Sequence, residues 1–208
     1  KNRFQITDAK LENGLQKFQL IDHNNKKQYK FSTNLSGRHN LYNVTAAICV
    51  AIEENISVKD IAKGLANFRG VGRRFELSEI YFSNHPHVLI DDYGHHPAEI
   101  LSTILAAKEK FPRQKICMIF EPHRFTRTQQ LFDDFKKVLS RVDFLLLLDI
   151  YPASEKPIKG ISSKKLASEI LKNHKNVHYI GNKDPMNWLH ENHQDFSILI
   201  TQGAGTIS

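Results

Sequence analysis

The stretch "LIDDYGHHPAEI", residues 89–100, runs from an apolar strand-like segment through a polar turn into a segment with helical periodicity. Leu89 and Ile90 lead into two carboxylates, a phenol and two imidazoles, and the periodic segment begins at Pro97. Apolar residues that recur three and four positions apart predict an amphipathic helix, here from Pro97 to about Lys110. The stretch therefore predicts a strand–helix unit with a polar connection.

The same alternation continues to the end of the chain. Strands are predicted at 74–82, 87–93, 115–120, 144–151, 177–180 and 196–205, and further helices at 131–142, from Ser163 and from Met186. "FLLLLDIY", residues 144–151, is apolar on both faces, as a central parallel strand should be. Regular strand–helix alternation predicts an α/β fold, with a Rossmann-like, doubly wound and mostly parallel sheet.

The first third of the chain follows another pattern. Three short strand-like pieces at 3–10, 15–22 and 28–34 precede two helices at 41–55 and 57–68. Ser57 followed by Asp60 has the spacing of a capping box at a helix start. "RGVGRRF", residues 69–75, then interrupts the periodicity with two glycines. We therefore expect one domain over 1–70 and a second over 71–208.

Bulk composition gives the class of protein. The 208 residues are 40% hydrophobic and 25% charged, which is ordinary for a globular chain. No apolar run of membrane-spanning length and no signal-peptide pattern occurs, so we expect a cytoplasmic protein. Cys49 and Cys117 lie in apolar segments, which predicts two buried, reduced thiols and no metal site. Because the chain opens on Lys1 in mid-pattern, we expect a fragment of a longer protein.

The positive charge has two interpretations. A formal net charge of +7 and a pI near 9.3 are compatible with a non-catalytic basic module that binds nucleotides or nucleic acid. The basic residues are scattered over predicted helix faces, however, and no nucleic-acid motif accompanies them. Attraction to anionic small molecules, phosphates above all, explains the same balance, so we expect no nucleic-acid partner.

Polar or glycine-rich residues follow three of the predicted parallel strands. They are residues 91–96, "EPHRFTRTQQ" at 121–130, and "QGAG" at 202–205. Ligands of open α/β sheets bind beyond the carboxyl ends of the strands, so these segments should converge on one crevice. Arg124 and Arg127 are three residues apart and could point the same way. Their planar guanidiniums suit a carboxylate or a phosphate.

Each of these residues also has a purely structural interpretation. Tyr93 could be a half-buried core aromatic, Asp91 or Asp92 a helix cap, and the two adjacent histidines an exposed turn. Arg124 and Arg127 could be surface ion-pair residues. Their joint placement at successive strand ends favours a functional site, because independent surface residues would not gather there.

Five motifs together resemble the bacterial Mur ligases, from about residue 30 to the end and in the family's order. They are "SGRHNLYNVTAA" (36–47), "GVGRRFE" (70–76), "DDYGHHPAEI" (91–100), "PHRFTRTQQLFDDF" (122–135) and "TQGAG" (201–205). The resemblance implies that 1–70 is the end of the family's central ATP-binding domain. It also implies that 71–208 is the Rossmann-like, amino-acid-binding carboxyl-terminal domain. Ala98 stands where many relatives have Thr.

The resemblance implies an ATP-dependent, amide-forming ligase of peptidoglycan synthesis. Its substrates would be ATP, L-alanine and the carboxylate of UDP-N-acetylmuramate, activated as an acyl phosphate with Mg²⁺. An alternative within the family is the recycling ligase that adds a whole tripeptide. The family's UDP-sugar domain and phosphate loop do not occur in this chain. We therefore expect a fragment that is inactive without the amino-terminal part of the same polypeptide, which would supply most Mg²⁺ ligands.

The resemblance also assigns residues by motif. His39, Asn40 and Asn43 resemble the group that contacts adenine. Arg74 resembles the arginine that reaches the ATP phosphates, and Asp92 the carboxylate that binds the ribose hydroxyls.

A second group resembles the residues around the incoming amino acid: Tyr93, His95, His123, Arg124 and Arg127. The two arginines would hold the alanine carboxylate, with His95 or His123 near the amine. A general-base role for either histidine is a hypothesis, because the attacking amine must lose its ammonium proton.

Overall fold

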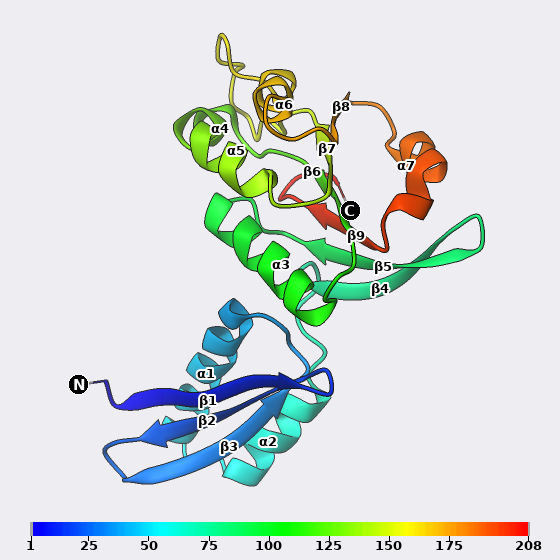
Figure 1. Cartoon of the computed structure of the whole chain (residues 1–208). Coiled ribbons are helices and arrows are strands. Elements are labelled where there is room, and N and C mark those ends of the chain that lie inside the picture. Colours follow the sequence, from blue (N-terminus) through cyan, green and yellow to red (C-terminus); the bar gives the residue numbers. More distant parts are fainter. Residues whose placement is uncertain (1, 208) are drawn as a thin grey trace. The chain divides into compact units, whose positions relative to one another are not determined.

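The protein is represented by a computed structural model that describes residues 2–207. These residues form two compact units. One reaches from the amino-terminal end to Gly70 and includes Leu105–Lys110, and the other consists of Val71–Ile104 and Phe111 onward. Each unit is described by itself below, beginning with the first (Figure 1).

The first unit is an antiparallel sheet with two helices. Strands β1 (Phe4–Glu12), β2 (Leu15–Asp22) and β3 (Lys27–Thr33) pair in sequence order, as the three strand-like pieces predicted. Helix α1 (Arg38–Glu53) begins before the predicted Leu41, and α2 (Val58–Asn67) follows. The Ser57 hydroxyl accepts the Asp60 amide at 3.1 Å, which confirms the predicted cap.

The core of this unit lies between the sheet and its two helices. Alternate residues of β2, such as Phe18 and Leu20, are buried, because a strand presents every second side chain to one face. They meet the buried stripes of α1 and α2, which lie on one side of the strands (Figure 1). The members are Phe18, Leu20, Phe31, Leu41, Val44, Ile48 and Ile61.

The second unit is built on a six-stranded sheet in the order β4-β5-β9-β6-β7-β8. The strands are β4 (Glu76–Phe82), β5 (His85–Asp92), β6 (Ile116–Phe120), β7 (Phe144–Leu148), β8 (Val177–Gly181) and β9 (Ile198–Gln202). Only the β4–β5 hairpin is antiparallel among these pairs. The predicted mostly parallel α/β sheet is confirmed.

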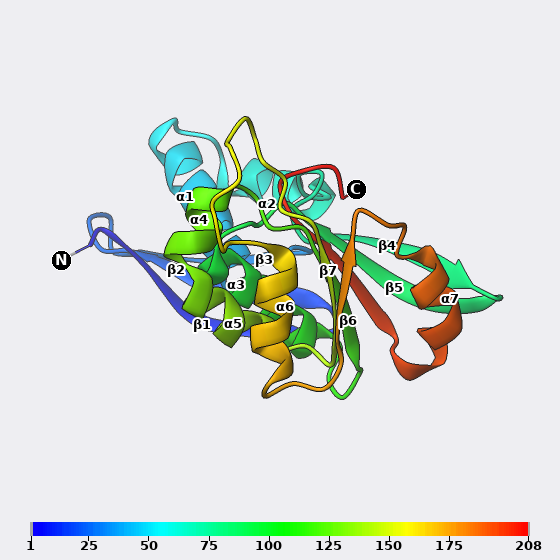
Figure 2. The same cartoon turned by 90° about the horizontal axis from the view of Figure 1, so that it is seen from above.

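Helices cover both faces of this sheet. Helices α3 (Pro97–Lys110), α5 (Phe132–Leu139) and α6 (Ser163–Leu171) lie on one side of the strands, and α7 (Met186–Asn192) lies on the other (Figure 2). Phe120 packs against Phe135 of α5 with ring centroids 5.6 Å apart. Cys117 and Ile119 point the opposite way, toward Leu189 of α7. Because successive side chains of a strand point to opposite faces, β6 contributes residues to the core on each side of the sheet.

The helix predicted at 131–142 is confirmed as α5, which ends earlier, at Leu139. A short helix that was not predicted, α4 (Phe125–Gln130), precedes it, and the backbone leaves helical geometry between the two at Leu131 (φ −110°, ψ 22°). Two other local predictions were wrong. The strand predicted at 144–151 ends at Leu148, and its extension pairs with the β6 extension through an isolated Tyr151–His123 bridge. Cys117 is fully buried as predicted, whereas Cys49 is only half-buried.

A histidine cluster predicts that this unit loses stability in mild acid. His193 is 6% exposed, and burial lowers its pKa below the usual 6.5, with further lowering by His85, His87 and His190. A depressed folded-state pKa means that its stability contribution is complete above pH 6.5 and is lost as pH falls through the lowered pKa. Urea unfolding at pH 7.5, 6.5 and 5.5 measures the loss as a falling urea midpoint. In His193→Phe the midpoint should depend less on pH. A wild-type midpoint that does not change over this range would contradict the prediction.

Candidate active site

Three polar strand ends meet at one edge of the sheet, as predicted. β9 lies between β5 and β6, with Asp92 in register with Gln202 and Gln202 in register with Phe120. Because the three strands are parallel, their carboxyl ends share an edge. The loops at 91–96, 121–130 and 202–205 therefore emerge side by side.

Asp92 joins two of these loops, at 91–96 and 202–205, to the 69–75 segment. Its carboxylate accepts the amides of Phe75 at 2.9 Å and Gly94 at 2.8 Å, and the Gln202 side-chain amide at 2.7 Å. A Cβ on Gly94 would lie 2.6 Å from both Asp92 Oδ1 and Gln202 Nε2, so the turn closes tightly over the carboxylate. Asp92 is 4% exposed. Asp92 therefore holds the loop, and the ribose contact predicted for it stays a prediction.

The neighbouring Asp91 forms a separate link. Its carboxylate accepts the Thr201 hydroxyl at 3.1 Å and pairs with the Arg73 guanidinium at 3.4 Å. Arg73 also donates to the carbonyl of Gly203 at 2.7 Å, which ties the residue to the glycine turn. No role was predicted for Arg73 from the sequence. Its contacts make it the residue that fastens the 69–75 segment to the sheet edge.

Arg74 remains accessible beside Tyr93. The guanidiniums of Arg73 and Arg74 lie 5.3 and 5.5 Å from the Tyr93 ring centroid, within cation–π range. Arg74 is exposed, and Tyr93 is 37% exposed. The predicted phosphate-directed arginine therefore presents its charge at the same edge as the predicted amino-acid group.

Four aromatic rings form a row across the edge. Tyr93 and His95 have centroids 5.6 Å apart, His95 and His123 5.5 Å, and His123 and Tyr151 5.4 Å. The last pair is stacked, with an interplanar angle of 17°. The structure thus brings three predicted residues together and adds Tyr151. The sequence could have indicated Tyr151, because it lies just beyond the apolar strand β7, as the other candidate residues lie just beyond their strands.

His123 has a lowered pKa. Burial is the largest cause, followed by Coulombic interactions with His95, Arg127 and Arg124. Arg127 Nη1 lies 3.2 Å from His123 Nδ1 and also donates to the His123 carbonyl at 3.2 Å. The pKa direction favours a neutral imidazole at physiological pH.

The two predicted arginines differ in their surroundings. Arg124 is exposed and sits at the amino-terminal end of α4 with φ 74°, a left-handed conformation that is uncommon outside glycine. Its amide donates to the Tyr151 carbonyl at 2.8 Å, which holds this strained turn. Arg127 is half-buried, one helical turn along α4. Glu155 closes the same helix end by accepting the Thr126 amide at 3.0 Å and hydroxyl at 2.6 Å.

Glu121 is a third residue, after Arg73 and Tyr151, for which the sequence predicted no role. It is 7% exposed and accepts the Thr206 amide at 2.7 Å and the Thr206 hydroxyl at 3.2 Å. It therefore fixes the glycine turn after β9. A carboxylate directly after an apolar strand was visible in the sequence, but its partner lies 85 residues away.

The predicted adenine group lies in the first unit, on α1. Asn40 is 6% exposed and donates to the Ser36 carbonyl at 2.8 Å, so its amide stabilises the helix start. Asn43 is exposed and His39 half-buried. The side chain of Asn43 is therefore the more accessible of the two, and the adenine contacts stay predictions.

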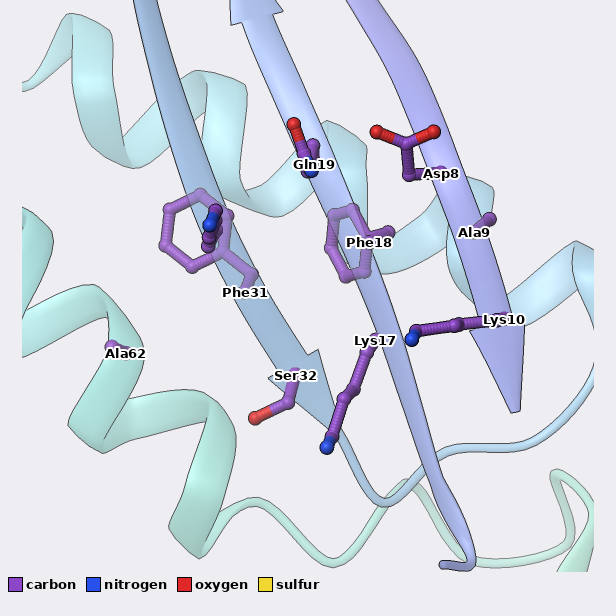
Figure 3. Close-up of a pocket in the computed structure, with 10 residues that line it drawn as sticks. Asp8, Ala9, Lys10, Lys17, Phe18, Gln19, Phe31, Ser32 and Ala62 are labelled. Atoms are coloured by element: carbon purple, nitrogen blue, oxygen red, sulfur yellow. The ribbon is translucent and has the colours of Figure 1, made fainter. Parts of the chain in front are cut away.

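A pocket of about 740 Å³ in the first unit contains none of the predicted site residues (Figure 3). It is lined by Asp8, Ala9, Lys10, Lys17, Phe18, Gln19, Lys30, Phe31, Ser32 and Ala62. Glu12 pairs with Lys10 at 3.3 Å and Lys17 at 2.5 Å, so two of its cations are already neutralised. The pocket therefore does not compete with the sheet edge as a candidate active site.

Within residues 2–207 there is no group of three or more His, Cys, Asp or Glu side chains that could hold a metal ion. Across the same range, each helix is too short or too polar to cross a bilayer.

Comparison with known proteins defines the class. Residues 73–205, which include the whole sheet edge described above, match the family model described as "Mur ligase, glutamate ligase domain". The chain belongs to the Mur ligase family.

Individual relatives extend the match over most of the chain. It is 39% identical over 200 residues to the UDP-N-acetylmuramate–L-alanine ligase of Hydrogenovibrio crunogenus, covering 95% of this chain and 43% of that protein. The ligase of the same name from Buchnera aphidicola is 44% identical over 192 residues, covering 88% and 39%. The chain thus spans less than half the length of these relatives.

A solved structure supports the fold. The UDP-N-acetylmuramate–alanine ligase of Thermotoga maritima superposes with a TM-score of 0.74 at 22% identity, covering 100% of this chain and 44% of that one.

Proposed function

We propose that the protein containing this chain joins L-alanine to the carboxylate of UDP-N-acetylmuramate in an ATP-dependent reaction of peptidoglycan synthesis. The observation that carries the proposal is the 39% and 44% identity to two ligases of that name. In this proposal residues 71–208 form the amino-acid-binding domain, and residues 1–70 form the end of the central ATP-binding domain. The rest of the polypeptide supplies the UDP-sugar domain and the phosphate loop.

The reaction requires two steps. The γ-phosphoryl group of ATP moves to the muramoyl carboxylate, giving an acyl phosphate and ADP. The amine of L-alanine then attacks the acyl carbon, and the tetrahedral intermediate collapses to the amide as phosphate leaves. The first step needs positive charge around the phosphates, and the second needs a neutral amine.

The arginines at the sheet edge suit the carboxylate of the amino acid. Arg127 is half-buried and contacts His123 through Nη1 alone, so its remaining N–H groups are available. Neither Arg124 nor Arg127 forms an ion pair with a carboxylate within the described part of the chain. A bidentate contact with a substrate carboxylate would supply the missing partner.

The remaining roles follow from exposure. Arg74, exposed beside Tyr93, is placed to meet a phosphate oxygen. Asn43 is the accessible amide for adenine, whereas Asn40 and Asp92 act by holding their own backbone segments. Mg²⁺ would neutralise phosphate charge, and because residues 2–207 hold no cluster for it, its ligands would come from the rest of the polypeptide. The protein would act in the bacterial cytoplasm.

The test is an acceptor comparison with the complete gene product. ADP release is measured with ATP, Mg²⁺ and UDP-N-acetylmuramate, adding either free L-alanine or the tripeptide. Turnover that depends on L-alanine is expected. Turnover with the tripeptide alone would identify the recycling ligase instead. No turnover with either, together with salt-sensitive DNA or RNA binding, would favour the basic binding module.

A further inference from the structure

His123 is held from two directions by Tyr151. The backbones pair as a parallel bridge, in which Arg124 N donates to Tyr151 O and Tyr151 N donates to Pro122 O, both at 2.8 Å. The Tyr151 ring stacks on the imidazole at 5.4 Å and 17°. The ring therefore covers one face of His123, while His95 stands 5.5 Å away.

The hydrogen-bond partners distinguish the two histidines. A guanidinium has only donors, so the 3.2 Å contact from Arg127 requires His123 Nδ1 to accept. Neutral His123 then carries its proton on Nε2. His95 Nδ1 lies 3.2 Å from the Tyr93 carbonyl, which can only accept, so this nitrogen carries the proton. The Nε2 of neutral His95 is left with a lone pair, and it has no hydrogen-bond partner among residues 2–207.

We propose that Tyr151 is a positioning residue which, with Arg127, fixes His123 as a hydrogen-bond donor through Nε2–H, so that His95 alone accepts the proton of the attacking amine. This inference rests on the proposed ligation. His95 Nε2 gains the ammonium proton and becomes an imidazolium. His123 keeps its protonation state and donates to an anionic oxygen of the acyl-transfer intermediate.

The charges around His123 support this division. The groups that face it are His95 from the β5–α3 loop, Arg124 and Arg127 from α4, Glu155 from the loop after β7, and Tyr151 itself. Burial and the Coulombic interactions with His95, Arg127 and Arg124 lower its pKa, and Glu155 opposes them only in part. Protonating Nδ1 would also set an imidazolium N–H against the Arg127 N–H. His123 is therefore a poor proton acceptor in this setting.

The first test reads the tautomers directly, without any ligation. Nitrogen-15 NMR of the histidine rings in this chain should show Nδ1 of His123 unprotonated in the wild type and in Tyr151→Phe, which keeps the stacked ring. Tyr151→Ala should give mixed tautomers and move the His123 pKa up toward its usual value, because lost burial removes the largest cause of its lowering. Tyr179→Ala is the matched control, since Tyr179 bonds Asp149 and not His123.

The second test uses the complete ligase. Tyr151→Ala should lower kcat/KM for L-alanine about 100-fold, as expected for a misplaced catalytic group, and Tyr151→Phe should restore most of it. His123→Gln retains a hydrogen-bond donor, so its rate should still fall as the pH decreases (the acid limb of the pH–rate profile). His95→Gln removes the proton acceptor and should abolish that acid limb.

Two results would overturn the inference: an Nδ1-protonated His123 in the wild type, or loss of the acid limb in His123→Gln. Failure of ligation with the expected tautomers would instead reject the proposed function and leave the positioning intact.

Discussion

Replacing Asp92 by Asn is expected to lower the free energy of unfolding by about 1–3 kcal/mol, the cost of leaving a buried hydrogen-bond donor without an acceptor. The carboxylate accepts hydrogen bonds from Phe75, Gly94 and Gln202 while 4% exposed. An amide of the same shape has one acceptor oxygen, and its NH₂ group would face donors. At least one buried N–H, that of Phe75 beside the new NH₂ group, would lose its partner.

Asp91→Asn is the matched control. It removes the adjacent carboxylate, which is half-buried and pairs with Arg73 at 3.4 Å. A partly exposed ion pair contributes at most about 1 kcal/mol. Urea denaturation of the two variants compares them under the same conditions. Equal losses, or a larger loss for Asp91→Asn, would contradict the internal role assigned to Asp92.

Arg127→Ala in the complete ligase is expected to lower kcat/KM for L-alanine by about 100- to 1,000-fold, the range seen when one preorganised donor is removed. The variant loses the proposed carboxylate contact and the donor that sets the His123 tautomer. Both KM and kcat should change, because the first contact binds the substrate and the second serves the reaction.

Arg127→Lys separates charge from geometry. A lysine keeps the positive charge but cannot form the planar, two-pronged contact of a guanidinium. The kcat/KM of Arg127→Lys should therefore stay below about a tenth of the wild-type value. Arg113→Ala is the control, because Arg113 is exposed and lies before β6, at the opposite end of the strand from the candidate site. Full activity of Arg127→Ala would remove Arg127 from the site.

The strands of the second unit were predictable because their pattern is local. β6 and β7 are almost entirely apolar, which predicts central strands covered on both sides. Helix α4 was not predictable in this way, because its sequence FTRTQQ carries no apolar stripe and the buried residue given for it is the polar Thr128. Apolar periodicity identifies a helix only where the helix buries an apolar face.

The candidate site was predictable in position but not in the role of each side chain. The period of a strand places Asp92 on the same face as Ile90, which is fully buried, and Asp91 on the other. That alternation was available in the sequence and pointed to an internal role for Asp92. The contacts of Glu121 and Tyr151 were not available, because they depend on which strands become neighbours.

The position of β9 has a consequence for biosynthesis. β9 is the last of the six strands to be made, yet it lies between β5 and β6 and hydrogen-bonds to both. Until residues 198–202 leave the ribosome, the sheet exists as two halves with open, apolar edges. Such edges promote aggregation, so the nascent domain needs protection until translation has passed its final strand.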